Sequence, residues 1–180
     1  MRDCRKPFVN AVLLFLGLLV GPFGGSLSHG TEVDIFQGRI DGFIYGDVYT
    51  VFGKTESEVI LRIGEPLRRV IGTFPNLHVP DTTNTYIQLY YRELSIDLLH
   101  SGATGADLLL RVHLEDPGYS FSGGLGVGSL RDVLEAYLGP ADRSDGSGSL
   151  VYGDAEGNST VTFTLEKDRV KSITWSYYYE

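Results

Sequence analysis

The sequence predicts an α+β protein of two tandem units, each a helix followed by a three-stranded antiparallel meander, with pseudo-twofold symmetry and an N-terminal signal peptide. Three observations predict this fold. Two short segments share the same helix start and stop signals, later stretches alternate apolar and polar residues, and turn residues separate those stretches. The length of 180 residues, 42% of them hydrophobic, suits one ordinary domain or two small ones.

Residues 1–28 have the three parts of a secretory signal peptide. Basic residues come first, an apolar run follows from 9 to 20, and Ser26 and Ser28 form a small-residue cleavage site. The run is shorter than the about 20 residues that a membrane-spanning helix needs. We therefore expect an exported protein, periplasmic or secreted, with no stable membrane span after cleavage. An uncleaved N-terminal membrane anchor is the alternative.

The charge of the chain limits its partners. The full chain has a formal net charge of −8, and cleavage would remove three of its 15 basic and one of its 23 acidic residues, leaving a net charge of −10. An acidic chain gains nothing from contact with a polyanion, which argues against nucleic acid as a partner. The sole cysteine, Cys4, belongs to the predicted signal, so the mature chain would have no disulfide and no thiolate metal cluster.

The first predicted helix follows a capping box. Thr55 is the expected N-cap, its side chain accepting from the backbone N–H three residues later, and Glu58 reaches back toward the helix start. Val59 and Ile63 follow at helical spacing, and Gly64 ends the helix.

The second predicted helix has matching signals. Ser129 is the expected N-cap, and Asp132 is the acid three residues later. An apolar stripe follows at helical spacing, and Gly139 with Pro140 ends the helix. The match between the two helices predicts a duplication.

Six stretches are predicted to be strands because apolar and polar residues alternate in most of them. Three follow each helix, at 85–91, 94–98, 108–114, 150–152, 160–165 and 170–175. The alternation leaves one sheet face for the helices and the other for solvent or a partner. Residues 67–84 are expected to form a long loop, a kind of segment that often carries function.

The predicted boundary between the units lies in the glycine-rich segment 115–126. It separates a first unit at 29–116 from a second at 117–180, and the sequence leaves open whether they form one domain or two lobes.

The order of these signals resembles a known domain. An apolar residue and glycine precede each cap, Gly-Pro or Gly-x-Pro follows each helix, and the last meander ends in Val170–Ile173. This pattern resembles the SmpA/OmlA-type domain of outer-membrane-assembly lipoproteins and its tandem form in β-lactamase inhibitor proteins. The resemblance covers about residues 44–176 and implies helix-meander units with a protein-binding, assembly or inhibitor-like role. The carrying residues are Gly53, Thr55, Val59, Ile63, Gly64, Pro66, Gly128, Ser129, Leu134, Leu138, Gly139 and Pro140.

Two features of those families are missing from this chain. It has no cysteine after the apolar run for lipid attachment, and no pair of cysteines for a disulfide in each unit. The specific role within the two groups therefore stays open.

No motif for catalysis or metal binding is present. The chain has no Gly-x-Ser-x-Gly elbow, no P-loop and no His-Glu-x-x-His, and its four histidines lack the i, i+4 spacing that places two ligands on one helix face. We therefore predict no catalytic residue, no metal and no cofactor, and a protein that is not an enzyme.

Tyrosine is the strongest compositional signal of contact, with 11 Tyr against one Trp. Tyr gives a large contact area at low entropy cost and is enriched in binding surfaces. The candidate binding residues are the strand and tail aromatics and two residues of the long loop, namely Tyr86, Tyr90, Tyr152, Trp175, Tyr177, Tyr178, His78 and Asp81. The alternative for the strand aromatics is core or cross-strand packing, and for the tail a frayed end.

These observations predict an exported, non-enzymatic module that binds an unidentified protein partner through its open sheet faces. A periplasmic protein that binds a small molecule or a glycan is the first alternative. A hydrolase with acid/base carboxylates is the second, and it would require two acids that converge in a pocket.

Overall fold

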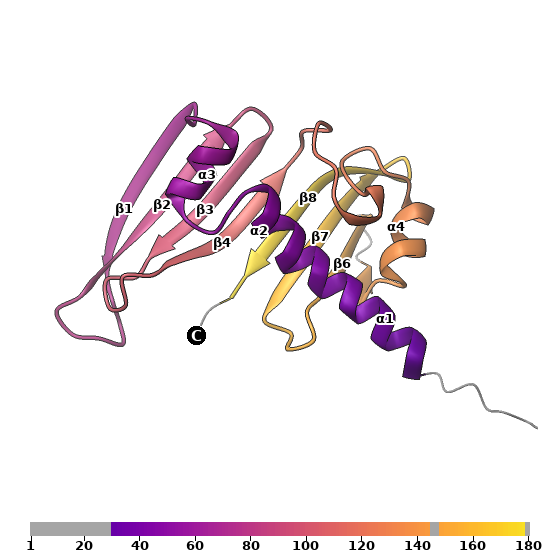
Figure 1. Ribbon diagram of the computed structural model, residues 1–180, viewed down its shortest axis with the longest axis horizontal. Coiled ribbons are helices and arrows are strands. Elements are labelled where there is room, and N and C mark those ends of the chain that lie inside the picture. Colours follow the sequence, from indigo (N-terminus) through magenta and orange to yellow (C-terminus); the bar gives the residue numbers. More distant parts are fainter. Residues whose placement is uncertain (1–29, 145–147, 179–180) are drawn as a thin grey trace, which may run out of the picture.

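The computed structural model describes residues 30–144 and 148–178, so the predicted signal peptide at 1–28 lies outside the described residues. The described chain forms one antiparallel sheet of eight strands in the order β1-β2-β3-β4-β8-β7-β6-β5, with helices on one of its faces (Figure 1). The α+β class is therefore confirmed. In the part of the chain that the structure describes, no helix is long and apolar enough to cross a membrane.

The six predicted strands are all present, and each extends beyond its expected limits by one to several residues. They are β2 (Thr83–Tyr91), β3 (Leu94–His100), β4 (Asp107–Leu114), β6 (Ser149–Gly153), β7 (Ser159–Glu166) and β8 (Arg169–Tyr177). β4 pairs antiparallel with β8 over four residue pairs, which joins the first four and the last four strands into one sheet.

Two further strands correct the predicted three-stranded meanders to four strands on each side of the β4–β8 pairing. β5 (Arg143–Ser144) is a two-residue edge, whereas β1 (Arg68–Pro75) occupies eight residues of the expected loop 67–84. All eight residues of β1 are exposed, so this strand lacks the buried alternate positions that mark the others. Pairing with β2 makes it a strand, and the sequence pattern alone does not show that pairing.

The first predicted helix is confirmed as α3 (Glu56–Ile63). The Thr55 hydroxyl accepts from the N–H of Glu58 at 3.2 Å, and the Glu58 carboxylate accepts from the N–H of Lys54 at 2.7 Å, one residue before the expected target. Gly64 ends the helix with φ 99°, a region that favours glycine.

The second helix, α4 (Arg131–Leu138), also ends at its predicted glycine, but its start differs from the prediction. Ser129 does not cap it, because the Ser129 hydroxyl accepts from the N–H of Gly126 at 3.0 Å. The N–H of Arg131 instead donates to the carbonyl of Asp168 in the β7–β8 turn at 2.9 Å. The sheet, rather than a side chain, therefore holds this helix start.

A continuous helical run before Thr55 was not predicted. It consists of α1 (Gly30–Asp41), a π-helical turn η1 (Gly42–Asp47) and α2 (Val48–Val51), and it crosses the sheet in front of β6 to β8 and ends near β4 (Figure 1). Phe36, Ile40, Ile44 and Val48 recur every four residues, which is a helical signal. Glycine at positions 38, 42 and 46 obscures that signal, because glycine lowers helix propensity by about 1 kcal/mol each.

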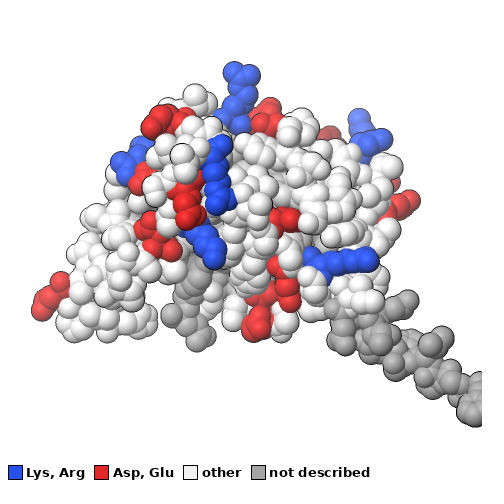
Figure 2. Space-filling view, viewed as in Figure 1, with Lys and Arg blue, Asp and Glu red and all other residues white. Residues whose placement is uncertain are grey.

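The core lies between this helical run and the sheet. Phe43 of η1 stacks on Trp175 of β8 with ring centroids 5.6 Å apart, and Phe121 packs on the same indole at 5.2 Å. The indole N–H of Trp175 donates to the carbonyl of Phe43 at 3.3 Å. These aromatic side chains cover the strands at the β4–β8 pairing. On this helix-covered side, acidic and basic groups are interspersed (Figure 2).

Candidate functional site

The face of the sheet opposite the helices is the candidate site, and we call it the open face. Side chains alternate between the two faces of a strand, so the buried positions identify which face each residue occupies. On β2, Ile87 and Leu89 are buried toward the helices, whereas Tyr86, Gln88 and Tyr90 lie on the open face and are only partly buried.

The strand register aligns these side chains into rows across the open face. One row runs through all eight strands as Arg68, Tyr90, Ser95, His113, Thr174, Thr162, Val151 and Arg143. The neighbouring row runs from β1 to β6 as Val70, Gln88, Asp97, Arg111, Ser176, Thr160 and Gly153. Aromatic and charged groups gather on β1 to β4, and hydroxyl groups on β7 and β8.

A shallow polar hollow of about 270 Å³ lies where the two rows cross β2, β3 and β4. It is lined by Gln88, Tyr90, Ser95, Asp97, Arg111 and His113. The Gln88 amide donates to the Asp97 carboxylate at 3.2 Å, and Asp97 faces Arg111 across the β3–β4 pairing. His113 Nδ1 lies 2.8 Å from the hydroxyl of Thr174. The hollow thus offers one anionic and one cationic group beside an aromatic ring.

Both predicted strand tyrosines belong to this surface. Burial, as the main cause, and a hydrogen bond to Asp97, as the second, raise the pKa of Tyr86 to about 12. The guanidinium of Arg68 lies 4.0 Å from the ring centroid of Tyr90, a cation–π contact that orients the ring at the rim of the polar hollow.

A second, apolar hollow of about 260 Å³ lies at the end of β1, β2 and β3. It is lined by Phe74, Asn76, Leu77, His78, Asn84, Leu99, Ser101 and Leu108. Tyr86 pairs in register with Leu99 and therefore lies between the apolar and the polar hollow. Leu77, which lines this hollow, is 91% exposed.

Of the two loop residues predicted as contacts, one lines this apolar hollow and the other does not. His78 lines the apolar hollow. Asp81 is exposed on the same loop at φ 58°, and it is not among the lining residues. The structure therefore places Tyr86, Tyr90 and His78 on one continuous surface.

Three other predicted contact residues lie on the helix-covered side, as the packing alternative expects. Tyr152 and Trp175 have no exposed surface, and Tyr177 is 7% exposed. Their polar atoms bind within the core, since Tyr152 donates to the carbonyl of Gly139 at 3.2 Å and Tyr177 donates to the carbonyl of Ile44. Burial removes all three from any contact at the surface. Tyr178, just after β8, is 65% exposed.

Sequence reasoning missed Gln88, Asp97 and Arg111. The alternation in each strand does assign these residues to the face opposite the apolar one. Their meeting in one hollow depends on the register between β2, β3 and β4, which includes a bulge at Asp97/Leu98. That register is a property of the paired strands and not of any single segment.

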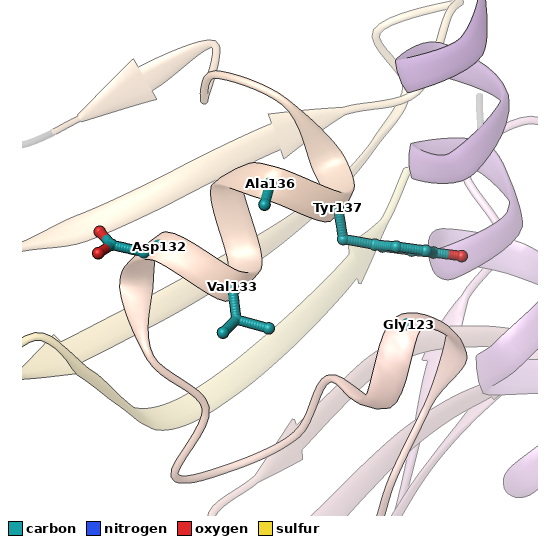
Figure 3. A pocket seen from close by; sticks show the side chains of 5 residues that line it. All are labelled: Gly123, Asp132, Val133, Ala136 and Tyr137. Atoms are coloured by element: carbon teal, nitrogen blue, oxygen red, sulfur yellow. The ribbon is translucent and has the colours of Figure 1, made fainter.

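A third hollow, of about 380 Å³, lies on the helix side beside α4 and the short helix η2 (Ser122–Gly124). Figure 3 shows the Tyr137 ring extending over the turn at Gly123, and the Asp132 carboxylate pointing away from both. A Cβ at position 123 would come within 2.6 Å of that ring, so the close approach requires glycine. With its one carboxylate turned outward, this hollow has no set of converging polar groups.

Within residues 30–144 and 148–178, no three His, Cys, Asp or Glu side chains are grouped to hold a metal ion. Comparison of the chain with protein-family models, with curated proteins and with solved structures found no match. The resemblance to SmpA/OmlA-type and β-lactamase-inhibitor-type domains therefore stays a prediction that depends on the residues given above.

Proposed function

We propose that this protein is an exported, non-enzymatic module that binds another protein through the open face of its sheet. The observation that carries the proposal is the uncovered surface formed by Tyr86, Tyr90 and the two hollows beside them. An antiparallel sheet commonly has one face on the core and one in solvent. This uncovered face presents aromatic rings and apolar side chains around the register neighbours Asp97 and Arg111.

The same surface has the composition of a binding interface. Interface centres are enriched in Tyr and Arg and surrounded by polar residues. Tyr86 and Tyr90 lie on β2 beside both hollows, and Thr and Ser side chains follow on the same face along β8 and β7. We also propose the tandem-unit organisation. It is supported by the two eight-residue helices, α3 and α4, which each end at a glycine with positive φ and precede a meander of four strands.

The test of binding is a site-specific photo-cross-link. We would place a photoreactive residue at Gln88 in the polar hollow and, as a control, at Leu61, which is 85% exposed on α3. The variants would be expressed in the source cell and cross-linked there. Cross-linked proteins would then be isolated from the envelope or the secreted fraction and identified by mass spectrometry. We expect one protein to cross-link from Gln88 and not from Leu61. Equal capture at both positions, or none from Gln88, would contradict the proposal.

Alanine substitution then identifies the energetic contacts. Substituting both Tyr86 and Tyr90 by Ala should weaken capture by more than about tenfold, because the two rings lie next to the two hollows and provide the large aromatic contacts of this surface. Tyr178→Ala is the matched control, since Tyr178 is exposed beyond β8. If Tyr178→Ala alone weakens capture, the tail rather than the open face binds the partner.

The polar hollow also supports a second candidate, a small polar ligand or a glycan. Its Tyr90 ring and the pair of Asp97 and Arg111 provide stacking and hydrogen bonding at one place. A thermal-shift screen of sugars and small acids separates this candidate from the first, because a bound ligand raises the melting temperature by mass action. Loss of that shift in Arg111→Ala would assign the ligand to the hollow.

Export remains part of the proposal. Mass spectrometry of the protein from the envelope or the medium would give its N-terminus. We expect it near residue 29; a chain that keeps residues 1–28 and stays in the membrane fraction would favour the uncleaved anchor.

A further inference from the structure

The outer edge of β1 has an uncovered backbone. The strand pairs with β2 on one side and forms one border of the molecule (Figure 1). All eight of its residues are exposed, including Val70, Ile71 and Phe74. Among the described residues, none donates to or accepts from the outer side of this strand. A long exposed edge with unpaired backbone groups is a template for another strand.

The hydrogen bond that follows β1 shows which backbone groups point outward. Asn76 donates its N–H to the carbonyl of Thr82 at 2.9 Å, which continues the register of Pro75 with Thr83. Backbone groups alternate in direction along an antiparallel strand, so the even-numbered residues face β2. The N–H and C=O groups of Arg69, Ile71 and Thr73 therefore point away from the sheet.

The opposite edge of the sheet is protected and gives the contrast. There β5 covers part of β6, and at the end of β6 the N–H of Gly153 donates to the Asp142 carboxylate at 2.7 Å. The carbonyl of Gly153 accepts from the side-chain amide of Gln37 on α1 at 3.2 Å. Side chains thus satisfy the free groups of Gly153, whereas β1 has no such cover in the described chain.

We propose that β1 pairs antiparallel with β1 of a second copy of this chain, about a twofold axis that passes between the two copies of Ile71. In this register Ile71 lies opposite Ile71, and Arg69 lies opposite Thr73. All three residues point their backbone groups outward, so every N–H and C=O among them gains a partner. The two sheets become one, with both open faces on the same side.

The side chains of β1 complement each other in the same register. Arg68 lies opposite Phe74 on the open face, which allows a cation–π contact at both ends of the pairing. No arginine lies opposite another arginine, and like charges directly opposite each other would destabilise the pair. The guanidinium of Arg69 already donates to the Glu56 carboxylate at 2.6 Å, so the charge of Arg69 is neutralised within each copy.

The alternative register centred on Gly72 forms the same number of backbone hydrogen bonds but leaves a carbonyl inside the paired segment without a donor. It sets Arg69 opposite Pro75, and proline has no N–H to donate to the Arg69 carbonyl. The Ile71 register avoids this loss because it ends before Pro75. Pairing at β1 uses the edge of the sheet and not Tyr86 or Tyr90, so it does not rest on the proposed function and either can fail alone.

The first experiment is sedimentation velocity of the full-length chain over a concentration series. We expect a reversible monomer–dimer equilibrium. Ile71→Lys places two lysines opposite each other and should raise the dissociation constant at least about tenfold. Leu61→Lys is the matched control, with the same substitution at an exposed position on α3, and should dimerise as the original chain does. A chain that is monomeric throughout, or a dimer that Ile71→Lys leaves intact, overturns the proposal.

The second experiment does not depend on how the lysine variant folds. In a Cys4→Ser background, Ile71→Cys introduces one thiol per chain directly opposite its counterpart, at the about 5.5 Å Cα separation that suits a disulfide. Mild oxidation should give a covalent dimer from Ile71→Cys and little from Leu61→Cys. Equal yields from the two variants would mean random collision and would overturn the pairing. A heterologous strand at this edge would leave the isolated chain monomeric in both experiments.

Discussion

At the residue scale, one buried carboxylate ties the N-terminal helical run to the sheet. Asp154, 6% exposed in the β6–β7 turn, accepts from the Tyr45 hydroxyl and from the N–H of Asn158 at 2.8 Å. Burial raises its pKa, but the hydrogen bonds from Tyr45 and from backbone N–H groups outweigh burial and lower the pKa below its ordinary 3.8. The ionised form is therefore the one that the fold stabilises.

Asp154→Ala should reduce the free energy of unfolding by about 1–3 kcal/mol at neutral pH, because it leaves buried donors without an acceptor. A carboxylate whose pKa is lower in the folded than in the unfolded chain stabilises the fold at pH values above its unfolded-state pKa. That contribution disappears as the pH falls through the folded-state pKa. The difference between the variant and the original chain should thus shrink below about pH 4. Urea unfolding measures it, with the exposed Glu156→Ala as control. A difference independent of pH would contradict the role of the charge.

Two tyrosines predict an alkaline limit to stability. Burial and a hydrogen bond to a carboxylate raise the pKa of both Tyr45 and Tyr86 from 10.0 to about 12. The fold holds these protons more tightly than the unfolded chain does, so the stabilisation is complete below pH 10 and is lost as pH rises toward 12. Ultraviolet titration should show a set of tyrosines that ionise at higher pH than the others. Tyr45→Phe and Tyr86→Phe should each remove one residue from that set. Titration of all tyrosines together would contradict this.

At the element scale, the ends of α3 and α4 form a matched pair. Gly64 and Gly139 both follow an eight-residue helix and both have positive φ, 99° and 83°. Their surroundings differ, since a Cβ on Gly64 would meet nothing within 4 Å, whereas a Cβ on Gly139 would lie 2.8 Å from the ring of Phe36 on α1. The glycine that ends α4 is therefore packed against Phe36 of the N-terminal run, whereas no side chain packs against Gly64 in this way.

This difference predicts unequal costs for the same substitution. Gly64→Ala should lower the free energy of unfolding by about 1–3 kcal/mol through backbone strain alone, because its φ and ψ lie in a region that is essentially restricted to glycine. Gly139→Ala should lower the free energy of unfolding by about 1–3 kcal/mol more than Gly64→Ala does, because the Phe36 ring must move. Thermal or urea unfolding of the two variants measures the gap. Equal losses would show that Phe36 yields without cost and that α1 packs loosely on α4.

At the scale of the whole molecule, the aromatic cluster holds the two parts of the sheet together. β4 and β8 share four residue pairs, and Phe43, Phe121 and Trp175 pack against one another over that pairing. The helical run that carries Phe43 thus lies over the junction between the two parts of the sheet. Loss of this run would expose the indole of the sole tryptophan.

Phe43→Ala should lower the free energy of unfolding by about 3–5 kcal/mol, since it removes a fully buried ring from the core. The emission of Trp175 should shift to the red as water reaches the indole. Ile35→Ala is the control, because Ile35 is 53% exposed on α1. Unchanged emission with lost stability would mean that the helical run stays docked and the cavity remains dry.

Local signals account for much of the fold. The Thr55 capping box and the glycines after both helices predicted α3 and α4 correctly, because caps and positive φ are decided within a few residues. Period-two alternation predicted six strands and puts Tyr86 and Tyr90 on one side of their strand, the side that the structure leaves open. The same alternation puts Trp175 beside the buried Ile173, but which face the helices cover was settled by packing.

The sequence by itself determined the α+β class, the acidic character, the two short helices and the faces of most strands, because these depend on composition and neighbouring residues. The tertiary structure alone decided the strand status of β1, the docking of Gly30–Val51 on the sheet, and the meeting of Gln88, Asp97 and Arg111. Each of these joins segments distant in the chain. The free energy that fixes them comes from contacts between elements, which no local pattern contains.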